Sequence, residues 1–336
     1  MSDVRFDTDI SGIAAMLEKY GEIVIFPHIS IDGDGLGSSL AFGLALEKKN
    51  KSVRICLDEE IPCLFEFLPG RHLIELFDNS KGLADVKKNA HPSPSCAMIA
   101  LDTGDTERLG KRADMFGKCP VTLNIDHHAT NTKYALYNYV RPDASAAGEI
   151  VYDIIREMGV DVDEDMATCL YVAIATDTGG FRFSNTTPAA HRIAADLIGA
   201  GVDVALVSQQ VFDSISYEKL KLLGMAANSL ELLEDRKIAV MVITDGMMQC
   251  AGAKEEDSEG IINFARNIRG VEAAILLREL SGGEVRVNLR SNFHADVSEI
   301  ARKYMGGGHK RAAGCTVKGS LEEIKHELVR EIKKQL

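Results

Sequence analysis

The sequence predicts an α/β fold, with an N-terminal doubly wound, mostly parallel sheet domain, a helical linker and a smaller C-terminal α/β domain. Three observations lead to this prediction. Short, nearly all-apolar runs alternate with helix-like runs through the first half of the 336 residues. Such alternation is typical of a parallel sheet that helices cover on both faces. Residues 188–235 read as helices without a strand, and the strand pattern restarts at Arg236.

The elements of the first domain follow from its apolar runs. The runs are short and end at glycine, proline or acidic residues, which favours buried strands over helices. Longer runs with apolar residues three and four apart predict helices. We expect strands over 22–27, 52–58, 96–102 and 121–126, and helices from the turn after 28–32 to Lys49, over 145–159 and over 163–178.

The second half repeats the alternation on a smaller scale. A strand is expected over 237–244, a helix near 256–267, and a hairpin of 271–280 with 284–291 around two glycines. A capping-box pattern of Asp296 and Glu299 starts another helix, the glycine-rich segment 305–314 reads as a loop, and a final helix covers 320–335. We expect domains at 1–190 and 236–336, a helical linker at 191–235, and a cleft between the domains.

Composition and charge narrow the class of protein. The chain is 46% hydrophobic and 26% charged, has no apolar run near the 18 residues of a membrane span, and begins unlike a signal peptide. Its seven cysteines are never spaced C-x-x-C, so we expect a cytoplasmic protein with reduced, buried thiols. A net charge of −12 argues against binding of long nucleic acid.

The charge is also uneven, at −15 over residues 1–235 and +3 over residues 236–336. This would suit a metal site facing an anion-binding site, although ordinary solvated surface explains the same imbalance.

The segment "HISIDGDGLGSS", residues 28–39, has the strand–turn–helix setting of a phosphate-binding loop. However, carboxylates repel phosphate. We therefore expect the side chains of His28, Asp32 and Asp34 to bind a cation, with Gly33 and Gly35 allowing a tight turn between them.

A rival interpretation is a non-catalytic dinucleotide-binding protein. Gly33, Gly35 and Gly37 resemble part of its glycine fingerprint but miss the required spacing, and Asp58 only loosely fits its ribose-binding acid. This interpretation also leaves the acidic and histidine residues at the other strand ends unexplained.

Several other elements of the first domain also end in acidic or histidine residues. Taken singly, each has an ordinary explanation, such as Asp34 capping a helix or Asp102 starting a turn. Together, at one edge of a parallel sheet, they would be costly without cations. Carboxylate and imidazole ligands without cysteine favour Mn²⁺ or a similar divalent ion. These further residues are Asp102, Asp126, His127, His128 and Asp177.

The motifs "HISIDGDGLGSS", "ALDTGD", "NIDHHATN" and "ATDTGGFRFSNTT", followed by "GGGHKRAAG", resemble those of the DHH phosphoesterases with a DHHA1 C-terminal domain. The resemblance extends from about residue 20 to 318 and is nearest to the stand-alone oligoribonuclease (nano-RNase)/pAp phosphatase branch. It implies two divalent ions, Mn²⁺ first, with Mg²⁺ or Co²⁺ as alternatives. His28 and Asp32 would bind one ion. The other ion would be bound by Asp34, His127 and Asp177, and Asp102 would bridge the two ions.

The resemblance also implies the remaining site residues. Asp126 would orient an imidazole, and His128 would face the substrate phosphate as a charge stabiliser or proton donor. On the strand 284–291, alternation places Arg286, Asn288 and Arg290 on one face, with Arg286 also explained as exposed polar surface. The residues expected to contact substrate are Arg290, Ser291, Gly307, Gly308, His309, Lys310 and, more weakly, Arg108.

The implied activity is hydrolysis of short oligoribonucleotides to mononucleotides and of 3′-phosphoadenosine 5′-phosphate (pAp) to AMP, through a bridging water activated by two metals. The alternative within this class is a phosphodiesterase for cyclic or linear dinucleotides. Expected partners are short RNA, pAp or dinucleotides, with no long nucleic acid and no membrane. The sequence does not decide whether the protein forms a homodimer.

Overall fold

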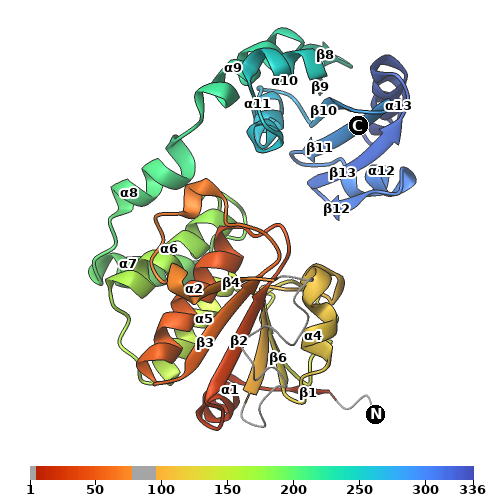
Figure 1. Cartoon of the computed structure of the whole chain (residues 1–336). Coiled ribbons are helices and arrows are strands. Elements are labelled where there is room, and N and C mark those ends of the chain that lie inside the picture. The colour runs from red at the N-terminus through yellow and green to blue at the C-terminus, as the bar shows by residue number, and fades with distance from the viewer. Residues whose placement is uncertain (1–4, 78–95) are drawn as a thin grey trace. The chain divides into compact units, whose positions relative to one another are not determined.

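The computed structural model of the chain describes residues 5–77 and 96–336. The chain divides into two compact units, Met1–Ser214 and Ile215–Leu336, and each contains its own sheet (Figure 1). The division between the units falls inside the segment 191–235.

Unit 1 is built on seven parallel strands in the order β1-β7-β6-β5-β2-β3-β4. The four expected strands form the middle of this sheet, which confirms the doubly wound α/β prediction. The outer strands were not anticipated, because they are short and partly polar. The bounds are β1 Phe6–Asp7, β2 Glu22–Pro27, β3 Ser52–Leu57, β4 Ile74–Leu76, β5 Cys96–Leu101, β6 Thr122–Asp126 and β7 Tyr137–Val140.

Helices cover both faces of this sheet, and successive residues of a strand serve opposite faces. In β2, Ile23 and Ile25 belong to one core, while Val24 and Phe26 belong to the other. The first core is the larger and includes most of the helices of unit 1 (Figure 1). These are α1 Ile10–Glu18, α2 Gly33–Lys48, α5 Ala147–Glu157, α6 Glu164–Asp177 and α7 Pro188–Gly199, with η3 Glu107–Arg112 and α4 Ala113–Gly117 on the other face.

The glycines of the first motif have a different role from the one expected. Gly33 and Gly35 lie in the first turn of α2, with no left-handed backbone, so they do not form a tight turn. A Cβ on Gly33 would lie 2.4 Å from the Thr176 side chain, and one on Gly37 2.4 Å from the Cys169 carbonyl oxygen. The glycines therefore let α2 pack closely against α6.

Unit 2 contains a six-stranded sheet in the order β12-β13-β11-β10-β9-β8. The expected hairpin is present, since β10 and β11 pair antiparallel, while β9 and β10 are parallel. Helices α9 to α11 and helices α12 and α13 belong to two separate hydrophobic cores on the two faces of this sheet. The strands are β8 Glu231–Leu233, β9 Ile238–Ile243, β10 Ala273–Leu280, β11 Glu284–Ser291, β12 Gly307–His309 and β13 Ala312–Lys318.

Three segments of the second half differ from the prediction. The segment 188–235 contains helices but ends in β8, which pairs with β9 across a turn of three non-glycine residues with positive φ, Glu234–Arg236. No glycine or proline marks that turn. The helix expected near 256–267 is broken at Gly260, where φ is +75°. The helices are α8 Val204–Ser208, α9 Tyr217–Asn228, α10 Asp245–Ala251, α11 Ile261–Arg266, α12 Val297–Lys303 and α13 Leu321–Lys333, with single turns η4 Gln209–Asp213 and η5 Glu255–Ser258.

The glycine-rich segment expected as a loop is a strand, β12, paired antiparallel with β13. A Cβ on Gly306 would lie 2.2 Å from the carbonyl oxygen of Gly314, and Gly308 has a φ of +137° with Ala312 oxygen 2.4 Å from its Cβ position. The glycines therefore allow two backbones to approach closely.

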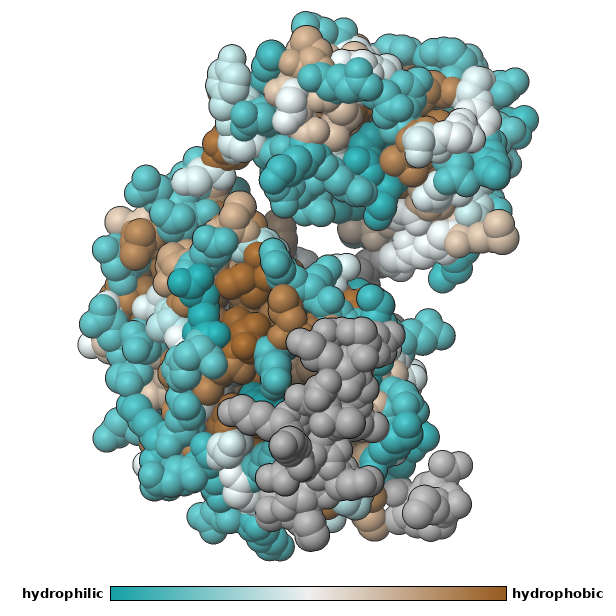
Figure 2. Space-filling view, in the orientation of Figure 1, coloured by the Kyte–Doolittle hydropathy of each residue, from teal (hydrophilic) through white to brown (hydrophobic). Residues whose placement is uncertain are grey.

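The face of the molecule shown in Figure 2 is mostly hydrophilic, with apolar residues gathered on part of unit 1. Within residues 5–77 and 96–336, no helix is long and apolar enough to cross a membrane. All seven cysteines are free thiols, and five of them are buried as expected, while Cys63 and Cys250 are exposed.

Candidate active site

The acidic and histidine residues singled out in the sequence meet at the carboxyl edge of the unit 1 sheet. His28 follows β2, Asp102 follows β5, and His127 follows β6. Asp32 caps the N-terminus of α2, accepting hydrogen bonds from the backbone N–H groups of Asp34 and Gly35, so Asp32 rather than Asp34 is the cap. Three triads of potential metal-ligating atoms result, each with its atoms within 4.8 Å of one another: His28–Asp32–Asp102, Asp34–His127–Asp177 and Asp102–His127–His128.

Asp102 lies between the first two triads. Its Oδ2 is 3.5 Å from Nε2 of His28, and its Oδ1 is 3.4 Å from Nε2 of His127. The side chain is buried, and Oδ1 has no hydrogen-bond partner among the described residues. Asp102 also adopts a left-handed backbone, with a φ of +55°. A buried, unpartnered carboxylate oxygen is costly in an apolar interior, and a cation would satisfy it.

The two histidines beside Asp102 are oriented by backbone carbonyls. Nδ1 of His28 lies 2.7 Å from the carbonyl oxygen of Ile29, and Nδ1 of His127 lies 3.3 Å from that of Ala144. When the ring is neutral and Nδ1 donates to the carbonyl, Nε2 is the lone-pair nitrogen, and in both histidines Nε2 faces Asp102. Metal-binding histidines in proteins are usually held in this way.

Asp34 is held by partners that the sequence analysis did not identify. Its buried carboxylate accepts hydrogen bonds from the N–H groups of Ala147 (2.6 Å) and Gly148 (2.9 Å) at the start of α5, and from the hydroxyl of Ser38 (2.8 Å). The N-terminal end of a helix stabilises a negative charge. Asp34 is thereby fixed with Oδ2 3.8 Å from Nε2 of His127.

Asp177, the last residue of α6, also has an unanticipated partner. The side-chain amide of Asn185 donates to Oδ2 of Asp177 at 3.3 Å and to its backbone oxygen at 3.1 Å. Asn185 lies in the quoted motif "FSNTT", so a polar residue in that motif was the only available signal. Oδ2 of Asp177 is 3.8 Å from Nε2 of His127.

His128 is bound to Asp126 rather than to a backbone carbonyl. Nδ1 of His128 lies 2.7 Å from Oδ1 of the fully buried Asp126, and the other oxygen of Asp126 accepts a hydrogen bond of 2.5 Å from Asn131. This hydrogen bond to Asp126 is the main cause of the raised pKa of His128.

The electrostatics of the cluster favour bound cations. Burial, together with the nearby carboxylate of Asp102, raises the pKa of Asp34 well above its ordinary value and that of Asp177 to about 6. Burial alone would lower the pKa of His127, but the carboxylates of Asp102, Asp34 and Asp177 outweigh it and raise that pKa to about 10. Without cations the carboxylates repel one another and hold a proton on His127. Divalent ions would relieve both effects.

In unit 2, several of the expected substrate residues line one cavity of about 680 Å³. Arg290 is half-buried. Among the described residues, its side chain donates one hydrogen bond, to the carbonyl of Leu289, and no carboxylate pairs with it. Burial, and then the neighbouring cation of Arg266, lower the pKa of Arg290. An unpaired, partly desolvated guanidinium favours an anion as partner. Arg286, Asn288, Arg290, Gly307 and Gly308 all line this cavity.

Arg286 is a weaker anion ligand than Arg290. Its Nη1 lies 3.2 Å from Oε1 of Glu255, the oxygen that also accepts a hydrogen bond from Arg278. The charge of Arg286 is therefore partly neutralised within unit 2.

Some expected residues lie neither in the acidic cluster of unit 1 nor in the cavity of unit 2. Ser291 is buried, and its hydroxyl donates to the carbonyl of Ala295, because alternation along β11 turns it away from the Arg290 face. Lys310 is exposed outside the cavity, and Arg108 is exposed in η3. The side chain of His309 lies outside the described part of the structure. Asp58, the ribose-binding acid of the rival dinucleotide interpretation, is ion-paired with buried Arg112 at 2.8 Å.

Comparison with known proteins agrees with this arrangement. Residues 22–174 match the model of the DHH family N-terminal domain, and residues 235–336 match that of the DHHA1 domain. The chain is 33% identical to the bifunctional oligoribonuclease and PAP phosphatase NrnA of Thermus thermophilus, over 92% of this chain and 91% of that protein. It is 28% identical to the protein of the same name from Bacillus subtilis, over 66% and 69%.

A solved structure has the same fold over nearly the whole length. It is an exopolyphosphatase-related protein from Bacteroides fragilis, 26% identical, with a TM-score of 0.90 over 97% of this chain and 95% of that one. The motifs, both domain matches and the similarity over most of the length agree, and the chain belongs to the DHH family of phosphoesterases, with a DHHA1 second domain.

Proposed function

We propose that this protein hydrolyses short oligoribonucleotides to mononucleotides and pAp to AMP at the acidic centre of unit 1. The observation that carries the proposal is the position of Asp102, whose two oxygens face His28 and His127 in separate ligand triads. A carboxylate placed in this way can be shared by two cations. The relatives named as oligoribonucleases and PAP phosphatases support the choice of substrates.

The residues present fit a pair of divalent cations, for which Mn²⁺ is our first choice. His28 and Asp32 would hold one ion, Asp34, His127 and Asp177 the other, with Asp102 shared. Oxygen and imidazole ligands without thiolate suit Mn²⁺, with Mg²⁺ or Co²⁺ as alternatives. When bound, such a pair supplies Lewis-acid stabilisation and a water made acidic enough to attack phosphorus near neutral pH.

His128 stabilises the phosphoryl group in this proposal. Asp126 accepts a hydrogen bond from Nδ1 of His128 and so leaves Nε2 of the ring as the group that meets substrate. Because the carboxylate raises the pKa of His128, the ring can carry a proton near neutral pH. It can then donate a hydrogen bond to the phosphoryl oxygens or a proton to the leaving oxygen.

Unit 2 binds the rest of the substrate. The cavity lined by Arg290, Gly307 and Gly308, of about 680 Å³, is of the size that takes a small ligand. Arg290 would bind a phosphate, and the backbone N–H groups of β12 would approach it closely because Gly307 and Gly308 have no side chain. Lys310, His309 and Arg108 stay as further candidates, whereas Ser291 is turned away from this cavity. Few phosphates are contacted, which agrees with an acidic protein that acts only on short nucleic acid.

The proposed setting is a reducing compartment such as the cytoplasm, because the cysteines are free thiols and five of them are buried. We also keep functional domains at 1–190 and 236–336 with a linker at 191–235. The family matches at 22–174 and 235–336 support that division.

A panel of substrates with Mn²⁺ tests the proposed function. The panel contains RNA of two to five nucleotides, pAp, cyclic di-AMP, the linear dinucleotide pApA and pyrophosphate. We expect mononucleotides from the RNA and AMP from pAp, with slow turnover of the cyclic dinucleotide. Faster turnover of the cyclic dinucleotide than of RNA would favour the dinucleotide alternative, and no hydrolysis of any member would refute the proposal.

A further inference from the structure

The loop that follows β11, residues Asn292–Ala295, is held rigidly on both sides. Oε1 of the buried Glu272 accepts hydrogen bonds from the N–H groups of Phe293 (3.1 Å), His294 (2.5 Å) and Ala295 (2.9 Å). The guanidinium of Arg311 donates to the carbonyl oxygens of Phe293 and Ala295. The Arg311 guanidinium therefore makes its hydrogen bonds within unit 2. A buried carboxylate and a guanidinium together fix the backbone of this short surface loop.

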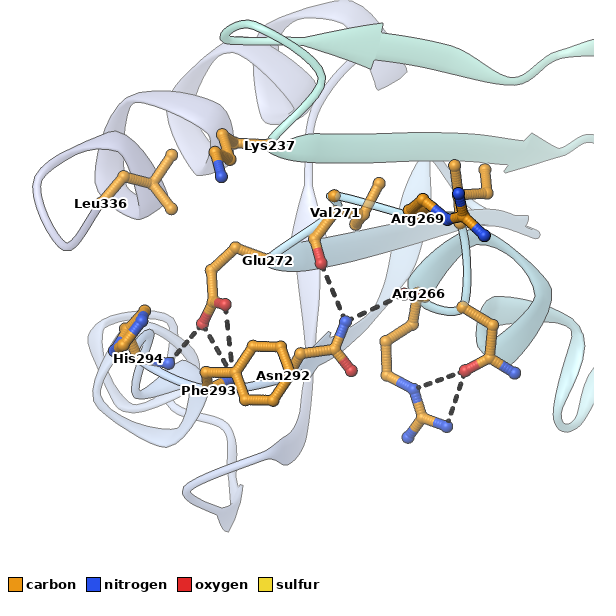
Figure 3. Close-up of a pocket in the computed structure, with 12 residues that line it drawn as sticks. Lys237, Arg266, Arg269, Val271, Glu272, Asn292, Phe293, His294 and Leu336 are labelled. Atoms are coloured by element: carbon orange, nitrogen blue, oxygen red, sulfur yellow. Dashed lines mark hydrogen bonds between the residues drawn. The ribbon is translucent and has the colours of Figure 1, made fainter.

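The same loop is tied to the end of α11. The side-chain amide of Asn292 donates to the carbonyl oxygens of Val271 (2.9 Å) and Arg266 (3.0 Å). Figure 3 shows these bonds together with those from Phe293 and His294 to Glu272. The loop backbone and the Asn292 side chain thus have partners within unit 2.

The Phe293 side chain is the exception, because the residue is 71% exposed although its backbone is fixed. The ring is not stacked on His294, since their centroids are 6.3 Å apart and their planes tilted by 51°. An exposed aromatic ring on a rigid backbone offers a flat surface at little cost in conformational entropy. Proteins that bind single-stranded nucleic acid use such rings to stack bases.

Basic side chains line the same pocket as this ring. Phe293 lines a pocket of about 570 Å³ together with Lys237, Arg266, Arg269 and His294 (Figure 3). Within the described residues, the side chains of Lys237 and Arg269 have no hydrogen-bond or ion-pair partner. Glu272, the acidic side chain of this pocket, is already bound to three N–H groups, and the C-terminal residue Leu336 completes the rim.

We propose that this pocket is a nucleotide subsite, in which Phe293 stacks on a base and Lys237 and Arg269 hold the adjacent phosphate. The inference rests on the proposed function and extends it, because it assigns the pocket to a nucleotide unit of the short RNA substrate. The pocket adjoins the anion cavity along the chain, since Phe293 follows Arg290 by three residues. Arg266 connects the two, as it lines this pocket and its charge acts on Arg290.

A fluorescent dinucleotide tests the stacking directly. We would titrate full-length Asp102→Asn protein, which binds without turnover, with a ribodinucleotide that carries 2-aminopurine, whose fluorescence falls on stacking. We expect quenching in the Asp102→Asn protein, which keeps Phe293, and in the same protein with Phe293→Tyr. In Phe293→Ala the quenching should be lost and the Kd should rise at least about fivefold, the lower end of the effect of one base–aromatic stack. Equal quenching and affinity in Phe293→Ala would overturn the proposal.

The matched control is Phe264→Ala. Phe264 is an exposed phenylalanine of the same unit, 58% accessible, in α11, and it does not line the pocket. We expect its replacement to leave quenching and Kd within twofold of the parent. An equal loss of quenching in both variants would show that surface aromatics act without a site and would contradict the assignment to Phe293.

Kinetics separate this inference from the proposed function. In the protein with intact Asp102, Phe293→Ala should raise KM for RNA with little change in kcat, and leave KM unchanged for a matched dinucleotide without bases. If the wild-type protein hydrolyses RNA and the Phe293→Ala variant has the same KM, the subsite is refuted but the proposed function is not. Wild-type protein without hydrolysis would refute the function, while the quenching result would still stand.

Two further measurements test the phosphate contacts and the source of the nucleotide. Arg269→Gln should weaken dinucleotide binding and reduce its dependence on salt, by about 0.7 in the slope of log Kd against log salt. An unchanged slope would contradict the phosphate contact. AMP should compete with the dinucleotide. If AMP bound through Phe293 without competing, the pocket would serve a free nucleotide, and the assignment to substrate would be wrong.

Discussion

Nε2 of His127 lies 3.4 Å from Oδ1 of Asp102, and that buried oxygen has no hydrogen-bond partner within residues 5–77 and 96–336. The opposite oxygen of the same carboxylate lies 3.5 Å from Nε2 of His28. The spacing is too long for good hydrogen bonds, and a cation bound by the carboxylate and the imidazole would satisfy each oxygen. This relationship links the strand ends of β2, β5 and β6 to the proposed chemistry.

Metal binding should release protons. The pKa of metal-free His127 is about 10 and that of Asp177 about 6. Since both are raised, the protonated forms are favoured below these values, and a cation must displace the protons. We predict that Mn²⁺ affinity rises about tenfold per pH unit between pH 7 and 9, and more steeply below pH 6. Calorimetric titration in buffers of different ionisation enthalpy measures the released protons, and an affinity independent of pH would contradict the prediction.

Asp126 should set the pH range of activity through His128. Asp126→Asn removes the main cause of the raised pKa of His128, so that pKa should fall. If the protonated ring is the active form, the basic limb of kcat moves to lower pH, and kcat at pH 8 falls roughly tenfold or more. The pH profile of kcat measures this. Metal content serves as the control and should stay unchanged, while an unshifted basic limb would show that Asp126 has only a structural role.

Arg112 should be important for stability. It is fully buried, pairs with Asp58 at 2.8 Å and donates to the carbonyl of Cys56. Arg112→Leu leaves the Asp58 carboxylate without its partner, and we predict that the free energy of unfolding falls by about 3–5 kcal/mol. Denaturant unfolding measures it.

The matched control for Arg112 is Arg54→Leu. Arg54 is 31% exposed and pairs with Glu22 on the sheet surface, so its loss should cost at most about 1 kcal/mol. Equal losses in the two variants would contradict the account.

The glycines at the start of β12, Gly306 just before the strand and Gly307 as its first residue, should differ in their tolerance of a side chain. In Gly306→Ala the new Cβ would lie 2.2 Å from the Gly314 oxygen, whereas at Gly307 no atom lies within 4 Å. We predict that Gly306→Ala destabilises unit 2 by about 1–3 kcal/mol, seen as a lower Tm, and that Gly307→Ala keeps the Tm. A lower Tm in Gly307→Ala would mean that this position is packed.

The sequence predicted the four central strands of the unit 1 sheet and the cluster of candidate metal ligands at its edge for one reason. In β2, β5 and β6 the apolar runs end directly at the polar residues, so strand prediction and site prediction coincide. The partners of those ligands were not predictable, because they come from distant parts of the chain. Asp34 binds the N–H groups of Ala147 and Gly148, more than 100 residues away, and no local pattern records such a contact.

Backbone conformation explains most of the errors. Strands β12 and β13 contain glycines that are required by close backbone contact, and a glycine run reads as a loop. The turn at Glu234–Arg236 is formed by residues that rarely adopt positive φ, so β8 was hidden within an expected helical segment. Phe293 lies in none of the sequence motifs, and its exposure became visible only in the structure.

The most direct test of the central claim is the metal content of Asp102→Asn, measured by elemental analysis after dialysis against Mn²⁺ and combined with kcat for a ribodinucleotide. If Asp102 is shared by two ions, we predict two Mn²⁺ per chain in the wild-type protein and at most one in the variant. We also predict that the kcat of the variant is lower than that of the wild-type protein by roughly a thousandfold or more. A variant that keeps two ions and near-normal kcat would show that Asp102 does not bridge a catalytic metal pair.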